Sequence, residues 1–325
     1  MTRSRFLVMA VSVLLVIAAC GGGAAGDFPA EDISIMAPAD PGGGWDSTAR
    51  AIAQSLTDGE LIETNANVYN VGGAGGTVGL AQFVSDATGD PYEMMVMGLV
   101  MVGAIQTNAA PVDLSEVTPL ARLTTEWEAI VVPADSPYQT LSDLIDAFVA
   151  DPTSISWGGG SAGGTDHQLV ALIAQAAGVS PDGVNYVAHS GGGEAMSAIL
   201  SGAVSAGVSG VSEFADQVTA GQLRWLAVSS DAPIPGIDAP TITESGIDVV
   251  LSNWRGIVGP PGLSEEDTAA VIGLLDQLHD SEGWQQALEA NGWTDYYLSG
   301  EGYAQFLDEE RARVDTVLRE VGLVS

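Results

Sequence analysis

Four glycine-rich stretches are the parts of this sequence whose residue types and spacing suggest chemistry. They read PGGGWD at 41–46, VGGAGGT at 71–77, WGGGSAGGTDH at 157–167 and HSGGGE at 189–194. Each follows a run rich in strand-forming residues and precedes a run with helical periodicity. Backbone N–H groups at a helix start lack partners and lie at the positive end of the helix dipole, and glycine lets a ligand approach them closely. The stretches therefore predict a site for a small anion such as a carboxylate.

The candidate ligand-binding residues all lie in these four stretches. They are Gly43, Gly44, Trp45, Asp46, Gly73, Ala74, Gly75, Gly76, Thr77, Gly158, Gly159, Ser161, Gly163, Thr165, His167, His189 and Ser190. Trp45 is expected to cover the ligand, because a tryptophan among glycines has little core to join. The alternative for this ring is packing across the helix start. Asp46 and Arg50, four residues apart, fit a solvent-side ion pair as well as a functional one.

The elements that must position these residues alternate between short β-rich runs and amphipathic helices. Such alternation is typical of α/β domains with mainly parallel sheets. The expected strands are 33–37, 67–70, 93–97, 129–132, 155–157, 184–188, 204–208 and 223–228. The glycine stretches occupy equivalent places in two halves of the chain. Because ligands bind beyond the carboxyl ends of parallel strands, two such domains face to face would place all four stretches around one cleft.

The first twenty residues predict export. Arg3 and Arg5 precede an apolar run over 6–19, which is too short to span a bilayer because a spanning helix needs about 20 apolar residues. The run ends in Ile-Ala-Ala-Cys, which matches a bacterial lipobox, and Cys20 is the one cysteine of the chain. We therefore expect a lipoprotein signal peptide over 1–20, a lipid on Cys20 and a flexible tether over 21–30.

Charge excludes several classes of partner. The sequence has 42 acidic residues, nine arginines and no lysine, so removal of Arg3 and Arg5 with the signal leaves 7 − 42 = −35. Such a surface repels nucleic acids and anionic lipid headgroups. The remaining chain is long enough for two domains, which must be held by their cores, because no cysteine is left for a disulfide.

Two enzyme motifs overlap in the third stretch. Gly158-x-Gly160-x-x-Gly163 matches the dinucleotide fingerprint, but the next expected strand ends in His189 rather than in an acid for the ribose. The residues GGSAG at 159–163 match the nucleophile elbow of a secreted serine hydrolase, with Ser161 as the nucleophile. This hydrolase is the alternative function, although the histidine in the required chain order, His279, lies in an expected helix.

Metal binding is not expected. The three histidines share no ligand spacing, and the chain has no cysteine besides Cys20. No cofactor motif remains once the dinucleotide fingerprint is set aside.

Taken together, these motifs resemble the substrate-binding proteins of the tripartite tricarboxylate transporters, also called the Bug family, over about 33–321. Its P-G-G-x-x-D-x-x-A-R corresponds to 41–50, and its G-A-G-G-x-x-G to 73–79. Its A-G-K-L-R-A-L-A-V corresponds to 220–228, and its V-P-T-x-x-E-A-G to 239–246.

The chain departs from the family pattern in the second half of the site. In the family's F-G-S-x-G-x-G-S-x-x-H, which aligns with 157–167, both serines are replaced by Gly159 and Gly164. The family's P-Y-K-G falls on 188–191 and loses its lysine, and the loop at 98–101 reads GLVM. We therefore expect a ligand other than the commonest family substrate.

The resemblance implies a two-domain periplasmic-binding-protein-like (Venus-flytrap) fold. The first domain would comprise 31–130 plus 250–325, and the second 131–249. It implies that first-domain loops and ordered waters hold the carboxylate of a di- or tricarboxylate, an aromatic acid or an acidic amino acid, while the second domain closes over its far end. The loaded protein, a monomer without catalytic activity, would deliver this ligand to large and small integral membrane subunits from a lipid-anchored position outside the cytoplasmic membrane.

Overall fold

The computed structural model describes residues 28–180, 183–189, 192–320 and 322–324. The predicted signal peptide, Cys20 and Ser190 lie outside these residues. Within them, no helix combines the length and the apolar character needed to cross a membrane.

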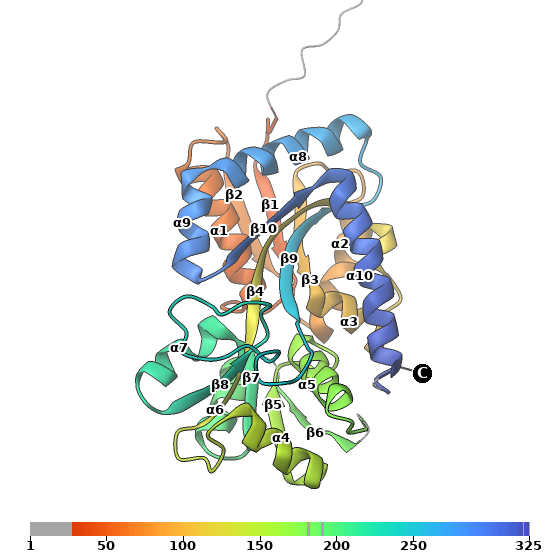
Figure 1. Cartoon of the computed structure of the whole chain (residues 1–325). Coiled ribbons are helices and arrows are strands. Elements are labelled where there is room, and N and C mark those ends of the chain that lie inside the picture. The colour runs from red at the N-terminus through yellow and green to blue at the C-terminus, as the bar shows by residue number, and fades with distance from the viewer. Residues whose placement is uncertain (1–27, 181–182, 190–191, 321, 325) are drawn as a thin grey trace, which may run out of the picture.

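Ten strands in the described residues form a continuous hydrogen-bonded sheet that runs through two lobes. They are β1 (Ile33–Ala37), β2 (Ala66–Asn70), β3 (Glu93–Gly98), β4 (Thr118–Pro133), β5 (Ser156–Gly159), β6 (Asn185–Ala188), β7 (Ala206–Gly210), β8 (Leu223–Val228), β9 (Ser252–Gly259) and β10 (Thr294–Ser299). The strand order is β2-β1-β3-β9-β4-β7-β5-β6, and β8 and β10 also pair with β4. In Figure 1, β1–β3, β9 and β10 lie in the upper lobe and β5–β8 in the lower lobe.

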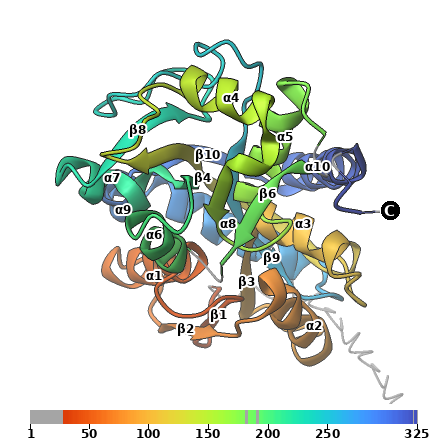
Figure 2. The same cartoon turned by 90° about the horizontal axis from the view of Figure 1, so that it is seen from below.

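Helices pack around the sheets of both lobes. Those of the upper lobe are α1 (Gly44–Asp58), α2 (Thr77–Asp86), α3 (Leu99–Thr107), α8 (Glu265–Asp280), α9 (Glu282–Asn291) and α10 (Gly300–Glu320). Those of the lower lobe are α4 (Leu141–Ala150), α5 (Thr165–Ala176), α6 (Gly192–Leu200) and α7 (Val211–Thr219). Figure 2 shows the same helices around the strands when the molecule is seen from the lower lobe. The C-terminal helix α10 contacts both α3 and α5, so it spans the two lobes.

Strand β4 joins the lobes because it changes partners along its length. Trp127 is opposite Ser252 of β9, whereas the next residue, Glu128, is opposite Gly210 of β7. The passage between the lobes therefore lies at 126–128. The domain limits predicted from the sequence remain a prediction.

The two-domain α/β class is as predicted, but the sheets are mixed rather than mainly parallel. Strand β1 pairs in parallel with β2 and β3, and β5 with β6 and β7. All pairings of β4 and β9 are antiparallel. Parallel α/β units thus form the outer part of each lobe, and the strands that connect the lobes run against them.

Candidate functional site

The first glycine stretch forms the start of helix α1. Gly43 is its N-cap and offers no side chain to the free N–H groups of the first turn. Asp46 holds this loop in place: its Oδ2 accepts from the Gly42 N–H at 2.9 Å, and its Oδ1 accepts from Asn70 Nδ2 at 2.9 Å. The Arg50 side chain, which donates to the same carboxylate, lowers the pKa of Asp46 to about 2. Asp46 is buried and acts as the anchor of the loop.

The second stretch forms a left-handed turn before α2. Gly73, Ala74, Gly75 and Gly76 all have positive φ, at 129°, 49°, 64° and 90°. Residues that carry a side chain rarely adopt positive φ angles, so four in succession favour glycine at these positions. Gly76 also supports the Trp45 ring, since a Cβ on Gly76 would lie 2.6 Å from Trp45 Cζ3. Trp45 is 8% exposed, so its ring packs across the helix start, and its contact with a ligand stays a prediction.

Several helices in the described residues begin at a glycine and therefore have no capping side chain. Five helices begin at a glycine N-cap without any capping side chain; these glycines are Gly43 (α1), Gly76 (α2), Gly98 (α3), Gly164 (α5) and Gly210 (α7). By contrast, α4, α8 and α9 are capped by the hydroxyls of Thr140, Ser264 and Ser281. Among the helices whose N-caps the structure describes, a capping side chain is thus missing from α1, α2, α3, α5 and α7.

Four of these uncapped starts, those of α1, α3, α5 and α7, lie beside β4 and β9 where these strands pass between the lobes, and the start of α2 lies against Trp45 of α1. A Cβ on Gly44 would lie 2.5 Å from Arg255 Nη2, and one on Gly210 would lie 2.5 Å from Glu126 Oε1. Arg255 Nη2 donates to Glu126 Oε2 at 2.5 Å, so these two contacts are linked. On the other side, Thr165 of α5 donates to Asn253 Oδ1 at 3.4 Å. We call Glu126, Glu128, Asn253 and Arg255 the junction.

The third stretch is braced by its own side chains. Asp166 Oδ2 accepts from the Gly160 N–H at 2.6 Å, and His167 Nδ1 accepts from the Gly163 N–H at 3.1 Å. The His167 ring stacks on Tyr186 with centroids 4.1 Å apart, and burial lowers the pKa of His167 to about 4. His167 is therefore neutral at physiological pH and serves as a strut for the loop.

The lower lobe brings two carboxyl groups, those of Asp166 and Glu213, toward Glu128 of the junction. Burial raises the pKa of Asp166 to about 7, and burial together with the Asp166 and Glu126 charges raises that of Glu128. The pKa of Glu213 is also raised, first by burial and then by the charge of Glu126. The Glu213 residue nonetheless stays solvent-accessible. The acids interact with one another across the space between α5, α7 and β4.

A model of one protein family matches most of the chain. The family is described as "Tripartite tricarboxylate transporter family receptor", and the match covers residues 48–323. The chain belongs to this receptor family. The resemblance drawn from the sequence motifs is thereby confirmed.

Relatives of this receptor cover its whole length. Protein BugT of Bordetella pertussis is 24% identical over 333 residues, which is 99% of each chain. A Rhodopseudomonas palustris protein solved with adipate superposes with a TM-score of 0.80 at 22% identity, covering 91% of this chain and 99% of that one. MatC from R. palustris, with bound malate, gives 0.75 at 21% identity and covers 90% and 100%. These likenesses show that the receptor has the fold of periplasmic solute-binding proteins.

The predicted site residues of the receptor fall into two groups. Those of the first two stretches lie on the upper side of the junction, at the starts of α1 and α2. Those from Gly158 to His167 lie below it, and His189 joins them because its Nδ1 lies 3.0 Å from the Gly159 carbonyl oxygen. Gly158 and Gly159 lie tightly against Val204 and Tyr186, so packing is sufficient to explain these two glycines.

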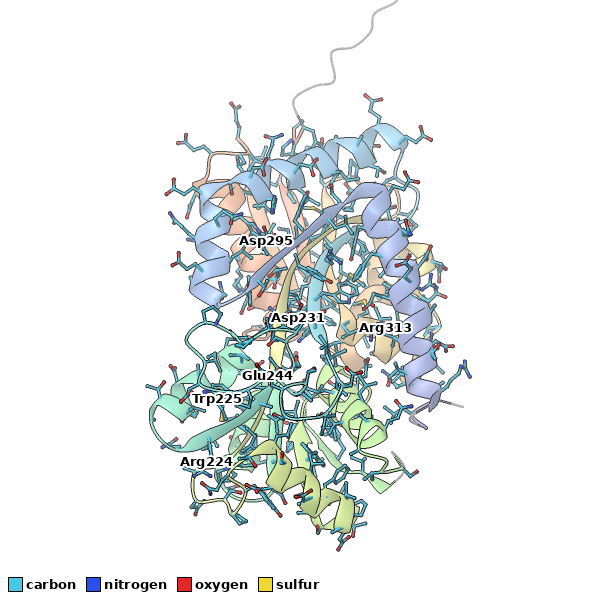
Figure 3. The ribbon with its side chains drawn as sticks, in the orientation of Figure 1. Arg224, Trp225, Asp231, Glu244, Asp295 and Arg313 are labelled. Atoms are coloured by element: carbon cyan, nitrogen blue, oxygen red, sulfur yellow. The ribbon has the colours of Figure 1, made fainter. Side chains whose placement is uncertain are left out.

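Ser161 is not brought to a histidine. His167 and His189 are hydrogen-bonded to the backbone of the loop, and His279 Nε2 lies 3.0 Å from Asp295 Oδ2 in the upper lobe, where Figure 3 labels Asp295. The stretch that carries Ser161 belongs to the lower lobe. The geometry gives no support to the hydrolase alternative. Among the described residues, no group of three or more His, Cys, Asp or Glu side chains is arranged to hold a metal.

The most important residues that sequence reasoning missed are those of the junction, with Asp166 and Glu213. A usable signal exists in the sequence: Glu126 and Glu128 are two apart and directly precede the apolar run 129–132, so on a strand they share one face. Acids at such positions are expensive to bury and often functional. Arg255 has no comparable local signal.

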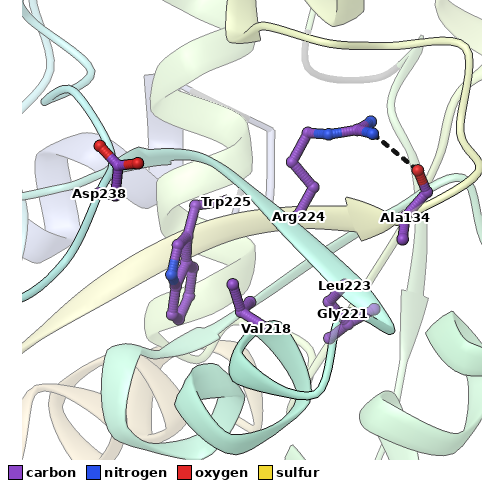
Figure 4. Close-up of a pocket in the computed structure, with 7 residues that line it drawn as sticks. All are labelled: Ala134, Val218, Gly221, Leu223, Arg224, Trp225 and Asp238. Carbon is purple, nitrogen blue, oxygen red and sulfur yellow. Dashed lines mark hydrogen bonds between the residues drawn. The ribbon is translucent and has the colours of Figure 1, made fainter.

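Two pockets of the receptor lie away from the junction. One lies in the lower lobe beside β8 and is lined by Arg224, Trp225 and Asp238, with Arg224 Nη2 donating to the Ala134 carbonyl at 2.7 Å (Figure 4). The other lies between α3 and α10 beside Arg311. Neither includes a residue of the four glycine stretches.

Proposed function

We propose that this receptor binds a small organic carboxylate whose –COO⁻ group lies against the free N–H groups at the starts of α1 and α2, next to Arg255. One observation carries the proposal: α1, which begins at the junction, and α2, whose start lies against Trp45 of α1, have bare glycine caps, whereas α4, α8 and α9 cap themselves. Unsatisfied N–H groups at the positive ends of helix dipoles are a ready site for an anion.

Arg255 supports this placement. The guanidinium carries five N–H donors, and the hydrogen bond found for it in the described residues uses one of them, toward Glu126. Its side chain is 6% exposed and lies directly beside Gly44. A carboxylate at the α1 start would therefore meet both backbone donors and a fixed cation. Adipate and malate in the solved neighbours are carboxylates, which agrees with this chemistry.

The remaining parts of the proposal follow the family. The receptor acts outside the cytoplasmic membrane as a monomer, binds without catalysis, closes its second domain over the ligand and delivers it to large and small membrane subunits. The ligand classes are di- and tricarboxylates, aromatic acids and acidic amino acids. The predicted domain limits, 31–130 with 250–325 and 131–249, define the two bodies that close.

Lipid anchoring at Cys20 is part of the same proposal. We expect the mature protein to begin at an acylated Cys20 and to partition into detergent, because the lipobox is followed by a short glycine-rich tether. Mass spectrometry of the mature N-terminus measures this. A chain that begins after Cys20 and carries no lipid mass would disprove the anchor.

Gly43→Asp tests the carboxylate site. The new side chain would cap α1 and fill the anion site with a tethered carboxylate. Gly43 suits this change because its Cβ would approach the Asp40 carbonyl at an ordinary 3.6 Å, whereas one on Gly75 would lie 2.5 Å from Ala104 Cβ. We expect a folded protein whose affinity for the best carboxylate falls by about a hundredfold or more, roughly 3 kcal/mol. Calorimetric titration measures it.

Ser264→Asp is the matched control, since it adds the same charge at the N-cap of α8, outside the site. It should bind like the unmodified receptor. Equal affinity in Gly43→Asp and Ser264→Asp would contradict the proposed function.

A further inference from the structure

The two lobes touch directly where α3 of the upper lobe meets the turn before α5 of the lower lobe. This turn, residues 161–164, is part of the third glycine stretch. A Cβ on Gly103 of α3 would overlap the Gly163 carbonyl oxygen and would lie 2.6 Å from Gln168 Nε2. A Cβ on Gly163 would lie 2.5 Å from Thr107 Cγ2. Because Gly103 and Thr107 are four residues apart, they share one face of α3, and this face lies against the turn.

We infer that this contact is a latch, which holds the lobes in the arrangement seen in the structure and positions the third glycine stretch against α3. The latch comprises Gly103 and Thr107 of α3 with Gly163 and Gln168 of the lower lobe. It is formed by the chain alone, so it acts whatever the identity of the ligand. It thus goes beyond the proposed carboxylate site, which concerns the starts of α1 and α2.

Gly103 is the first observation that supports a latch, because it lies in the middle of α3. Glycine weakens a helix interior, since its backbone loses more conformational freedom on folding than that of other residues. Outside α3 itself, the three atoms nearest to a Cβ at this position belong to Gly163 and Gln168. The glycine therefore lowers the stability of its own helix in order to admit the turn of the other lobe.

The turn and the helix are each fixed where they meet. The Gly163 N–H donates to His167 Nδ1 at 3.1 Å, and the Gly163 carbonyl accepts from Gln168 Nε2 at 3.0 Å. Both polar groups of Gly163 are therefore held by α5 side chains. On the other side, the Thr107 hydroxyl donates to the Gly103 carbonyl at 3.1 Å, which fixes the side chain that faces Gly163.

Gln168 is the second observation. Its side chain is fully buried, and its Oε1 has no hydrogen-bond donor in the described part of the chain. A buried amide with one unpaired end is unfavourable, and such groups are rare in folded proteins. The stability of the lower lobe does not explain this residue, whereas holding the Gly163 carbonyl against α3 does.

Apolar packing crosses between the lobes on the same side. Helix α3 contacts α5, and Met101 of α3 belongs to the same buried cluster as Leu169 of α5. Phe214 of α7 lies in a separate cluster, whose buried members all belong to the lower lobe. Helix α7 instead reaches the junction through a polar contact, in which the Ser212 hydroxyl donates to Glu126. Separation of the lobes at the latch would therefore expose apolar surface as well as break the backbone contact.

Gly103→Ala tests the latch. The methyl group should favour α3 as a helix but collide with the Gly163 carbonyl, so we expect a folded protein whose lobes stay further apart. Small-angle X-ray scattering of the ligand-free receptor measures this. The radius of gyration should be larger in Gly103→Ala than in the unmodified protein, with the same far-UV circular dichroism.

Gly273→Ala is the matched control. Gly273 also lies inside a helix, α8, but a Cβ there would meet no atom within 4 Å. This variant should keep the radius of the unmodified protein. Gln168→Leu gives a second reading that does not depend on a collision: it keeps the buried volume, removes the bond to Gly163 and should increase the radius by a smaller amount.

Titrations with malate and with adipate add a functional readout. Gly103→Ala should lower the affinity for either acid that the unmodified receptor binds by about tenfold, because the lower wall of the site is displaced. Equal radii and affinities in Gly103→Ala, Gln168→Leu and Gly273→Ala would overturn the latch and leave the carboxylate site standing. The expected change of radius in a receptor that binds no carboxylate would instead contradict the proposed function and leave the latch standing.

Discussion

Asp166 links the site to the stability of the protein at the level of single residues. Burial raises its pKa from 3.8 to about 7, so the folded receptor holds a proton that the unfolded chain has released. The contribution of Asp166 to the free energy of unfolding is therefore present below about pH 4 and is lost as the pH rises toward 7. The slope for one such proton is at most about 1.4 kcal/mol per pH unit.

Asp166→Asn should remove this dependence. The asparagine Oδ1 can still accept from the Gly160 N–H, which preserves the loop. Urea denaturation of the ligand-free protein between pH 4.5 and 7.5 measures the difference, and the variant should gain stability relative to the unmodified chain as the pH rises. Asp248→Asn, at an exposed position, serves as the reference. Parallel curves for Asp166→Asn and the unmodified protein would show that Asp166 ionises normally.

Candidate site residues could be predicted from the sequence where the site is formed by the backbone of a glycine turn. The glycines of 73–76 are needed for positive φ, and this need is visible in the sequence as a glycine cluster. Arg255 and Glu128 could not be found that way, because their role depends on β9 and β4 meeting from distant parts of the chain. The packing of the Trp45 ring could not be predicted for a related reason: Gly76 and Gly98, which give it a packing surface, are far from it in sequence.

Helix caps divide the elements into those that serve the site and those that serve stability. The Thr140 hydroxyl caps α4 by accepting from the Asp143 N–H, and the Asp143 carboxylate accepts in return from the Thr140 N–H. Thr140→Ala should therefore lower the free energy of unfolding by about 1 kcal/mol. Ligand affinity should stay within about twofold, because α4 lies at the outer end of the lower lobe, away from the passage between the lobes (Figure 1). A loss of binding in Thr140→Ala without a loss of stability would contradict this division.

Strand prediction succeeded where one face of a strand is simply apolar. The ranges 33–37 and 223–228 match β1 and β8. Of β4 only 129–132 was predicted, because its earlier part buries Arg122, Thr124, Thr125 and Glu126, and these polar residues break the apolar pattern. Strands β9 and β10 were not predicted either. The elements missed are thus largely those that pair along β4.

At the scale of the molecule, the two-lobed α/β class could be predicted from the sequence, but the way in which the two lobes are connected could not. Repeated strand, glycine loop and helix units indicated two similar α/β halves. The antiparallel strands that join them depend on long-range pairing, such as Arg122 with Gly256, which no local pattern contains. The strongly acidic composition also made the acidic residues of the site hard to recognise in the sequence. They are four of 42 acidic residues, namely Glu126, Glu128, Asp166 and Glu213.

The central claim is that backbone N–H groups at the uncapped helix starts hold the ligand's carboxylate. The most direct measurement is a titration of the ¹⁵N-glycine-labelled receptor, followed by amide chemical shifts, with the acid that raises its melting temperature most. We predict saturable shifts of the Gly43, Gly44, Gly75 and Gly76 amides, with none at Gly236 and Gly273, which have open space around them and lie outside the site. If the bound acid left all four amides of the upper lobe unchanged, or if no carboxylate bound at all, the account would be contradicted.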